Sequence, residues 1–393
     1  MTNSKKLHVL IIPSWYPRFK GDVGGSFFRE QGLALHKAGV GVGVVFPQIN
    51  SLKSLQGLIK LRGVDVSNDD GLKTYRYHFI NITPGLHALT QKRRLLIGMK
   101  LFERYIKDNG MPDIIHAHSL SNAGLLAKKI HKKYTIPYIV TEHFSGFLRN
   151  AVSDNLLAKL KPVVENASKC IAVSHSFKDS LNRQFATNKW SYLPNVVSDK
   201  FLQQPLNTTT KANSFTFLSV CFLNANKKID VLLKAFSIVC EQLENVRLQV
   251  GGDGPEKAKL ESLAINLNIS DKVDFLGSLN RDAVVSNMSN CDAFVSASEF
   301  ETFGVVIVEA LALGKPVIAT KCGGPESIMT PSVGYLVDVN SPSLLAEAMI
   351  LMHAKQDDFD PNTIRSYCKQ EFSEESVINR LTCTYNQALN LHE

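Results

Sequence analysis

Strand-length apolar runs recur along the chain, and a segment of helical composition follows most of them. The apolar runs are 7–12, 40–46, 72–80, 113–118, 138–141, 169–173, 215–220, 248–251, 273–276, 293–297, 316–319 and 334–337. The helical segments are 27–38, 90–108, 122–133, 155–167, 177–184, 231–240, 304–313, 341–353 and 373–391. This alternation predicts an α/β protein in which helices connect parallel strands. Residues 48–71 are polar and poorly patterned, which indicates a surface excursion.

The segment 304–313 is apolar on all sides, so we expect a buried helix. Glu309 lies in the middle of this helix, and a buried carboxylate is costly without a partner or an open site beside it. Two explanations remain open at this point: an internal pair between Glu309 and a lysine, or a ligand-binding role.

The loop before this helix contains a second acid, Glu301. It follows the strand 293–297, at the edge where ligands bind in open α/β sheets. The amides of Gly304 and Val305 begin the helix and are free to hold an anion. Two acids around an exposed helix start suit a ligand that carries both hydroxyls and phosphates.

The length of 393 residues predicts two domains. Residues 198–213 have the composition of a linker, so we expect domains at 1–197 and 214–372. Hydrophobic content of 44% and charge content of 20% are typical of soluble globular proteins. Seven scattered cysteines without a CxxC pair indicate buried thiols in a reducing compartment. No stretch is long enough to span a membrane or to act as a signal peptide, so we expect a cytoplasmic protein.

The net charge of +8 is unevenly distributed. Residues 1–195 contain 28 Lys and Arg against 12 Asp and Glu, whereas residues 196–393 contain 16 against 24. This asymmetry favours an anionic acceptor or an anionic membrane surface facing the first half. Nucleic acid is the alternative partner, but no recognition module accompanies the charge.

The segment 90–108 predicts an amphipathic helix with a strongly basic polar face. Its expected apolar face consists of Leu95, Leu96, Met99, Phe102 and Ile106. A solvated domain helix and a helix at the inner membrane surface are both compatible with this pattern.

Further candidates follow strands of the first half. Gly24 and Gly25 lie in a loop before a helix, an arrangement that can cradle an anion or form a plain turn. His118 ends the strand 113–118 at the ligand edge. Glu142 and His143 follow the next strand and are candidates for acceptor contact or acid/base assistance, with a structural pair as the alternative.

Candidates in the second half include Lys227, in a loop before the helix 231–240. Gly252 and Gly254 form a strand-to-helix turn, which needs glycines with or without a ligand. The spacing Asp358-Phe-Asp360 is that of a metal-held diphosphate, but no strand precedes it, so we expect a solvated turn and no metal site.

Several short motifs in order resemble retaining glycosyltransferases of family four. They are Asp113-x-x-His116-x-His118, Gly252-x-Gly254-Pro255, Glu301-x7-Glu309 with Phe303-Gly304 between them, and Gly323-Gly324-x-Glu326. The resemblance covers nearly the whole chain and implies a GT-B fold, two Rossmann-like domains with parallel sheets facing across a cleft. It also implies that a terminal helix, 373–393, crosses back to the first domain.

The resemblance assigns roles to single residues. It implies that Glu309 binds the ribose of a nucleotide, that Glu301 lies near the transferred sugar, and that the backbone of Phe303, Gly304 and Val305 faces the diphosphate. It places Gly24 and Gly25 near the donor phosphates, Gly252 and Gly254 near the base, and His118 against the sugar. Lys227 matches a diphosphate-binding lysine. Phe222 stands where the family has an arginine, so one expected cation is missing.

We therefore expect a glycosyltransferase that moves a sugar from a nucleotide diphosphate, UDP, to a glycan or lipid-linked acceptor with retention, in cell-surface polysaccharide or glycolipid synthesis. No cofactor or metal is expected. The alternatives are a non-catalytic GT-B protein that binds nucleotide or glycan, and a GT-B epimerase or phosphorylase.

Overall fold

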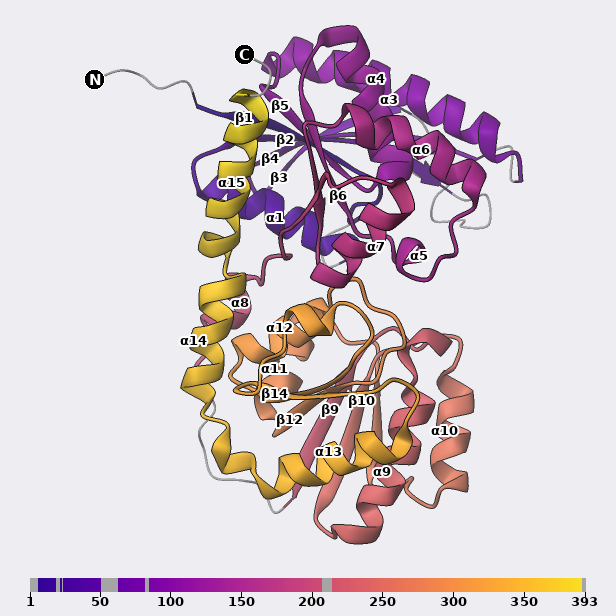
Figure 1. Ribbon diagram of the computed structural model, residues 1–393, viewed down its shortest axis with the longest axis vertical. Coiled ribbons are helices and arrows are strands. Elements are labelled where there is room, and N and C mark those ends of the chain that lie inside the picture. The colour runs from indigo at the N-terminus through magenta and orange to yellow at the C-terminus, as the bar shows by residue number, and fades with distance from the viewer. Residues whose placement is uncertain are drawn as a thin grey trace. The chain divides into compact units, whose positions relative to one another are not determined.

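The computed structural model describes residues 6–18, 22, 24–50, 63–81, 85–206 and 214–390. They divide into two compact units, each built around its own sheet (Figure 1). The first unit comprises Met1–Val173, Lys178–Leu193 and Val377–Glu393, and the second comprises Ser174–Phe177 and Pro194–Ser376. Chain segments far apart in sequence therefore contribute to the same core.

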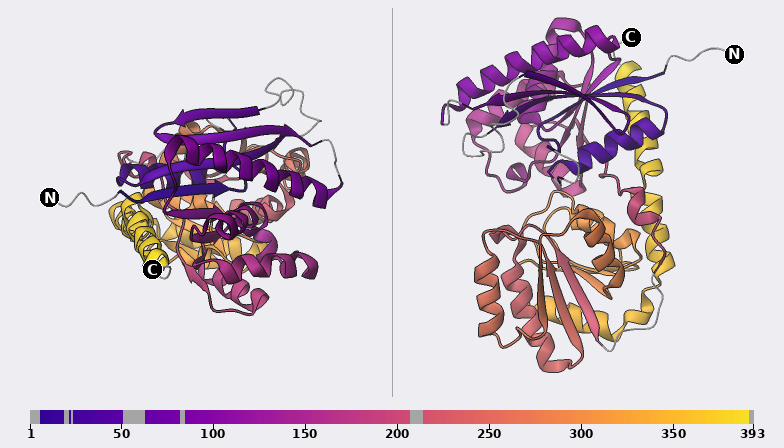
Figure 2. Two further views of the ribbon diagram at one scale, coloured as in Figure 1. Left: turned by 90° about the horizontal axis from the view of Figure 1, so that it is seen from above. Right: turned by 180° about the vertical axis from the view of Figure 1, so that it is seen from behind.

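The first unit contains an eight-stranded sheet in the order β3-β4-β2-β1-β5-β6-β7-β8. Its strands are β1 (His8–Pro13), β2 (Gly41–Asn50), β3 (Gly63–Asp69), β4 (Leu72–Ile80), β5 (Ile114–His118), β6 (Tyr138–Glu142), β7 (Lys169–Ala172) and β8 (Trp190–Tyr192). All neighbours pair in parallel except β3 and β4, which form an antiparallel edge. The central strand β1 is buried because helices cover both faces of the sheet (Figure 2).

The helices of the first unit follow the strands in alternation. They are α1 (Ser26–Lys37), α3 (His87–Asn109), the π-helical turn η1 (Leu120–Gly124), α4 (Leu125–Tyr134), α5 (Ser145–Leu148), α6 (Asp154–Asn166), α7 (His175–Phe185) and α15 (Glu374–Asn390). The terminal helix α15 is anchored in this unit by Tyr385, whose hydroxyl lies 2.7 Å from Nδ1 of the buried His116.

The second unit contains an entirely parallel six-stranded sheet in the order β11-β10-β9-β12-β13-β14. Its strands are β9 (Phe215–Val220), β10 (Val246–Gly251), β11 (Val273–Gly277), β12 (Ala293–Ser296), β13 (Val317–Thr320) and β14 (Gly334–Val337). Its helices are α8 (Asp199–Leu202), α9 (Ile229–Gln242), α10 (Lys257–Asn266), α11 (Arg281–Asn290), α12 (Val305–Ala312), α13 (Pro342–Ala354) and α14 (Pro361–Phe372), with short turns η2 (Ala225–Lys227), η3 (Pro325–Ser327) and η4 (Gln356–Asp358).

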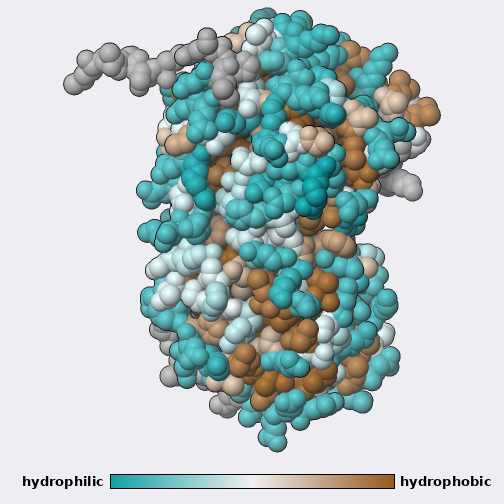
Figure 3. Space-filling model, in the orientation of Figure 1, coloured by the Kyte–Doolittle hydropathy of each residue, from teal (hydrophilic) through white to brown (hydrophobic). Residues whose placement is uncertain are grey.

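Helix α12 lies between layers. It contacts β12 and β13 on one side and α8 and α14 on the other, so its side chains from Ile307 to Ala312 are buried. This placement explains why the helix lacks a polar stripe. The exposed large apolar residues of the second unit include Leu344 and Leu351 of α13, each 39% exposed. Figure 3 shows brown residues among hydrophilic ones on this unit, as is usual for a protein surface.

The predicted α/β architecture with two parallel-sheet domains of Rossmann type is confirmed. Two local predictions were wrong, those for 48–71 and for Leu96, and the bounds of the linker at 198–213 stay a prediction. The stretch 48–71 is not one surface excursion, because it contains the end of β2 and all of β3; residues 51–62 lie outside the described part. Leu96 is 50% exposed, so it does not belong to the buried face of α3. The interval 198–213 contains helix α8, whereas residues 207–213 lie outside the described part.

Candidate functional site

Glu301 lies just after β12 and pairs with Lys227 from the η2 turn. Both side chains are about four-fifths buried, with exposed fractions of 18% and 21%. The hydroxyl of Ser298 donates to the same Glu301 oxygen at 3.0 Å. Burial tends to lower the pKa of Lys227, but the Glu301 carboxylate outweighs burial, and the net pKa is raised. Lys227 therefore stays charged at the carboxyl edge of the sheet.

The backbone holds Lys227 and Glu301 together. The carbonyl of Asn226 accepts a hydrogen bond from the amide of Glu299 at 2.8 Å, and the side-chain amide of Asn226 donates to the carbonyl of Phe300 at 3.0 Å. Lys228 adds an ion pair to Glu299 at 3.0 Å. The loops after β9 and β12 thus form one connected edge.

Glu309 is 2% exposed and pairs with Arg281, whose Nη1 lies 2.5 Å from Oε1 of Glu309. The Arg281 guanidinium also covers the ring of Phe201, 4.6 Å from its centroid. Burial raises the pKa of Glu309, and the Arg281 charge partly opposes that rise. Glu309 therefore has an internal cation beside it. The sequence analysis considered an internal pair with a lysine, whereas the partner in the structure is the arginine Arg281.

The start of α12 offers backbone amides as hydrogen-bond donors. Gly304 adopts a left-handed conformation with φ of +107°, which favours glycine. Within the described residues, no group accepts a hydrogen bond from the amide of Gly304 or Val305. The side chain of Phe303 is buried, so only its backbone can face a ligand.

Gly323, Gly324 and Glu326 complete this edge. The Glu326 carboxylate accepts from the amide of Gly323 at 2.9 Å, and Gly323 bridges in parallel to Glu301. A Cβ on Gly324 would lie 2.2 Å from the carbonyl oxygen of Phe303. This close approach demands a glycine and brings the loop after β13 against the start of α12.

Gly252 and Gly254 are also needed by packing. A Cβ on Gly252 would lie 1.8 Å from the Cys221 carbonyl oxygen, and one on Gly254 would lie 2.4 Å from the Leu223 carbonyl oxygen. The two glycines therefore allow the β10 turn to approach the loop that carries Phe222. Phe222 itself is 62% exposed. Its side chain carries no charge, so it does not replace the arginine expected at that position.

His118 lies at the end of β5 in an uncharged aromatic cluster. Its ring stacks on His116 with centroids 4.2 Å apart, and Phe28 of α1 lies 4.6 Å away. Nδ1 of His118 lies 3.2 Å from Nε2 of His143. Burial, followed by His116 and His143, holds the pKa of His118 well below its usual range. Its Nε2 is buried without a hydrogen-bond partner in the described chain.

Glu142 is fully buried and accepts hydrogen bonds from the amides of Leu120, His143 and Phe144 at 2.7–2.9 Å. Burial raises the pKa of Glu142, and these amides oppose the rise. Such a carboxylate orders the loop after β6. These contacts are those expected of a structural role for Glu142, which the sequence analysis left open as the alternative. His143, in contrast, contacts His118 directly.

Gly25 caps α1 with φ of +78°, and a Cβ there would lie 2.9 Å from the Trp15 carbonyl oxygen. The amide of Gly24 donates to Asp22 at 3.0 Å, and Asp22 also pairs with Arg18. The resemblance placed the Gly24 amide near the donor phosphates, but in the structure this amide already donates its hydrogen bond to the Asp22 carboxylate.

The second acid of the Asp358-Phe-Asp360 spacing has a structural explanation. Asp360 caps α14 by accepting from the amides of Asn362 and Thr363 at 3.2 and 3.0 Å. In the described ranges, no group of three or more His, Cys, Asp or Glu side chains could hold a metal ion. No helix of that same part of the chain is both long and apolar enough to cross a bilayer.

The second unit thus brings together Glu301, Lys227, Glu309 and the start of α12, and the first unit brings together His118 and His143. Sequence reasoning missed Arg281 because the helix α11 that begins with it was not predicted. The available signal was Asn280, whose side chain caps α11 by accepting from the amide of Ala283 at 2.9 Å.

Two family models match consecutive parts of the chain. Residues 25–201 match Glycosyltransferase Family 4, and residues 203–367 match Glycosyl transferases group 1. Together the matches cover most of both units and include every candidate residue described above except Gly24.

Named relatives point the same way. A glycosyltransferase of Methanocaldococcus jannaschii is 28% identical over 280 residues, which are 70% of this chain and 75% of the relative. The N-acetyl-α-D-glucosaminyl L-malate synthase of Bacillus anthracis is 25% identical over 291 residues, 70% of this chain and 75% of that protein. One subunit of the phosphatidylinositol N-acetylglucosaminyltransferase of Arabidopsis thaliana is 24% identical, over 70% of this chain and 62% of its own length.

Solved structures share the fold. The sucrose-phosphate synthase of Thermosynechococcus elongatus superposes with a TM-score of 0.76 at 19% identity, over 98% of this chain and 100% of that one. HepE of Anabaena, solved in complex with UDP, superposes with a TM-score of 0.73 at 19% identity, over 97% of this chain and 100% of that one. From the two matching models, the named relatives and the two parallel sheets, this chain belongs to the group 1 glycosyltransferases and has the GT-B fold.

Proposed function

We propose that this glycosyltransferase transfers a hexosyl group from a UDP-sugar to a glycan or lipid-linked acceptor with retention of configuration, in cell-surface polysaccharide or glycolipid synthesis. The observation that carries the proposal is the edge formed by the Lys227–Glu301 pair and the unpaired amides at the start of α12. A buried cation and two free donors are suited to a diphosphate, because they stabilise negative charge that develops as the sugar departs. Transfer needs no metal in this proposal.

Glu309 is proposed to bind the ribose hydroxyls. The carboxylate has a second oxygen besides the one that Arg281 contacts, and a ribose hydroxyl can donate to it. Arg281 would keep Glu309 ionised and oriented, as a positioning residue.

His118 is proposed to contact the transferred sugar through Nε2. That nitrogen is buried and has no partner in the described chain, which is costly unless a ligand supplies one. Because its pKa is held far below neutrality, His118 acts as a neutral hydrogen-bonding group and not as a cation.

The donor is tested by thermal shift with UDP, GDP and their sugars. We expect UDP and a UDP-sugar to raise Tm by several degrees at saturation, with GDP giving a smaller rise. Incubation with the preferred donor and an acceptor panel then tests transfer, and NMR of the product shows whether the anomeric configuration is retained. Equal shifts with all nucleotides, or an inverted product, would contradict the proposal.

The alternative function, binding without transfer, is favoured by one observation. Phe222 is 62% exposed where the family's diphosphate-binding arginine is expected, so the second unit has one cation fewer. Donor binding without transfer or hydrolysis across the acceptor panel would support this alternative. Conversion of the donor without any acceptor would instead indicate an epimerase.

We also propose that α3 contacts an anionic membrane from the cytoplasmic side. Leu89, Lys92, Leu96 and Lys100 are all exposed, and their spacing places them on one stripe of the helix. Leucines flanked by lysines suit an anionic lipid surface. Co-sedimentation with phosphatidylglycerol vesicles at low salt tests this contact, and Leu96→Glu should weaken it while UDP binding stays unchanged. Equal recovery with phosphatidylcholine vesicles would contradict it.

A further inference from the structure

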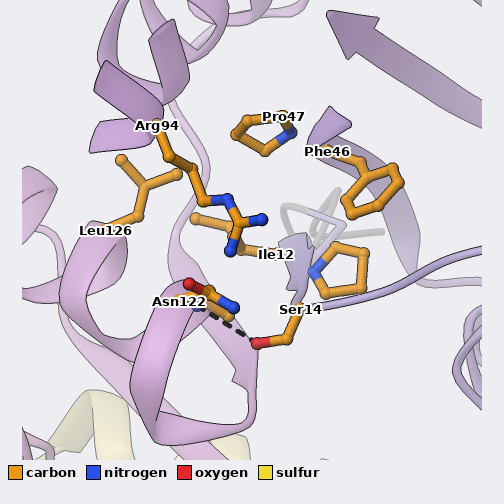
Figure 4. A pocket seen from close by; sticks show the side chains of 9 residues that line it. Ile12, Ser14, Phe46, Pro47, Arg94, Asn122 and Leu126 are labelled. Atoms are coloured by element: carbon orange, nitrogen blue, oxygen red, sulfur yellow. Dashed lines mark hydrogen bonds between the residues drawn. The ribbon is translucent and has the colours of Figure 1, made fainter. Parts of the chain in front are cut away.

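The first unit contains a small pocket beside the carboxyl end of β1 (Figure 4). Its lining comes from five elements: β1 and the residue after it, β2, α3, the turn η1 and α4. The polar side chains that line it are Arg94, Ser14 and Asn122, and its apolar walls include Ile12, Phe46 and Leu126. None of the described residues that line it carries a carboxylate.

Arg94 brings an uncompensated charge to this pocket. Its Nε is buried without a hydrogen-bond partner, and within the described chain no carboxylate pairs with its guanidinium. Burial alone lowers the pKa of Arg94 to about 10. Neighbouring arginines are satisfied: Arg93 donates to the Ile80 carbonyl, and Arg76 donates to Pro17 and Gln48. A partly buried guanidinium whose Nε has no partner is costly, so a ligand that pairs with it gains affinity.

The two other polar side chains can add donors. The Ser14 hydroxyl oxygen accepts from the amide of Ala123 at 3.3 Å, a bond drawn in Figure 4, which leaves the hydroxyl proton free to donate. The side-chain amide of Asn122 has no hydrogen-bond partner among the described residues. Guanidinium, hydroxyl and amide donors together match an oxyanion, and Arg suits the planar or tetrahedral oxygens of carboxylate and phosphate.

The pocket is too small for a whole sugar ring with its surroundings. Its cavity volume is about 10 Å³, room for about one water molecule or one oxygen atom. One oxygen atom of a terminal group is therefore the part of a ligand that this cavity admits, with the rest of the group at its mouth.

The pocket is next to the histidine cluster. The amide of Ser14 donates to the carbonyl of His118 at 3.2 Å, so one backbone hydrogen bond joins the pocket's loop to the end of β5. A molecule with its anionic end at Arg94 would extend along the same carboxyl edge that carries His118.

We infer that the Arg94 pocket binds a terminal oxyanion, a carboxylate or a phosphate, of the acceptor substrate. The inference rests on the proposed function, because it assigns the anion to the acceptor of that reaction. The pocket then selects acidic acceptors over neutral ones, with Arg94, Ser14 and Asn122 as specificity-determining residues.

Calorimetric titration of the full chain tests the site. The probes are inorganic phosphate, glucose 6-phosphate, glucuronate and glucose, added at saturating UDP so that the proposed diphosphate site is occupied. We expect the anions to bind and glucose not to bind. Arg94→Met should weaken anion binding on the order of tenfold to a hundredfold, because a charge-assisted hydrogen bond is lost, and Arg94→Lys should retain part of it.

Arg183→Met is the matched control, since Arg183 is an exposed arginine of α7 in the same unit. It should leave anion binding unchanged. Arg94→Met should keep or raise Tm, because it removes a partly buried charge without a carboxylate partner, so loss of binding would not reflect unfolding. Ser14→Ala gives an independent second variant with a smaller loss.

The outcomes separate the two proposals. Anion affinity equal in the wild type and Arg94→Met, or equal affinity for glucose and the anions, would overturn the Arg94 site while UDP binding still supported the donor proposal. Absence of UDP binding with Arg94-dependent anion binding would overturn the donor proposal and leave the anion site. A preference for glucose 6-phosphate over glucuronate identifies phosphate as the source of the anion, and the reverse identifies a carboxylate.

Discussion

The strands β4-β2-β1-β5-β6-β7 of the first sheet follow the same order as the six strands of the second, but the carboxyl edges of the two sheets differ in their electrostatics. The edge of the first sheet carries the neutral rings of His116, His118 and His143, packed against phenylalanines. The edge of the second sheet carries the charged pairs of Lys227 with Glu301 and of Arg281 with Glu309. Neither edge is a copy of the other, even though both follow parallel strands.

The difference indicates how each edge handles charge. The paired acids and cations of the second unit keep full charges stable in a buried place, where a charged ligand can exchange contacts with them. In the first unit, burial removes charge from the histidines, and Arg94 is left as an unpaired cation nearby. This division is consistent with a charged nucleotide-sugar that binds at the edge of the second sheet. It is also consistent with one anionic group of the acceptor that binds at the edge of the first sheet.

Acidification should produce the largest contrast. Burial lowers the pKa of His116 and of His143 to about 3 in the folded protein, against about 6.5 unfolded. The unfolded state therefore binds more protons between these values. The contribution of the two histidines to the free energy of unfolding is fully present above pH 6.5 and falls as pH drops toward 3, by up to about 1.4 kcal/mol per pH unit for each histidine. Glu309 has a raised pKa and loses nothing in that range.

Hydrogen exchange followed by mass spectrometry at pH 7, 6 and 5, corrected for the intrinsic rate, checks this contrast. Peptides from β5 and β6 should lose protection on acidification before those from β12 and β13. Parallel loss of protection in both sheets would show that the histidine cluster does not set the acid sensitivity.

Lys227→Met should give the next largest effect, on turnover. If Lys227 stabilises the departing diphosphate, its loss lowers kcat on the order of 10²–10³, as for other lost contacts to a developing charge. Lys234→Met, which removes an exposed lysine of α9, is the control and should leave kcat unchanged. A kcat within about twofold of the wild type would mean that the Lys227–Glu301 pair only holds the loop.

Glu309→Gln should weaken UDP binding by about tenfold, because a neutral amide is a weaker acceptor for ribose hydroxyls than a carboxylate. The change also leaves Arg281 without its partner, so stability falls as well. A double-mutant cycle with Arg281→Met separates the two effects, with UDP affinity and Tm measured for all four proteins. Unchanged UDP affinity in Glu309→Gln, with a lowered Tm, would reduce Glu309 to an internal ion pair.

Removal of divalent metal should have the smallest effect. Asp360 is used as a helix cap, so the Asp358-Phe-Asp360 spacing has a structural role, and turnover in EDTA should equal turnover without it. Asp360→Ala should lower Tm slightly, because the cap of α14 is lost, and leave turnover unchanged. Turnover lost in EDTA and restored by Mn²⁺ would overturn the metal-independent mechanism.

The sequence by itself determined the α/β class and most elements, because strand and helix patterns depend on neighbouring residues. The bounds of β4, β9 and β14 agree with their apolar runs, and α12 follows from a run without polar residues. Glu301, Glu309 and His118 were selected because strand ends and helix starts can be located along the chain. The predictions about their ligands remain predictions.

Only the tertiary structure decided which partners these residues have. Arg281 pairs with Glu309 across 28 positions, Tyr385 reaches His116 across 269, and Arg94 faces a pocket built from five elements. In each case the partner is set by how strands are ordered in a sheet and how helices pack on it, and local periodicity carries no information about either. The charge of a side chain can be read from the sequence, but whether that charge is paired, buried or left free depends on contacts between distant segments.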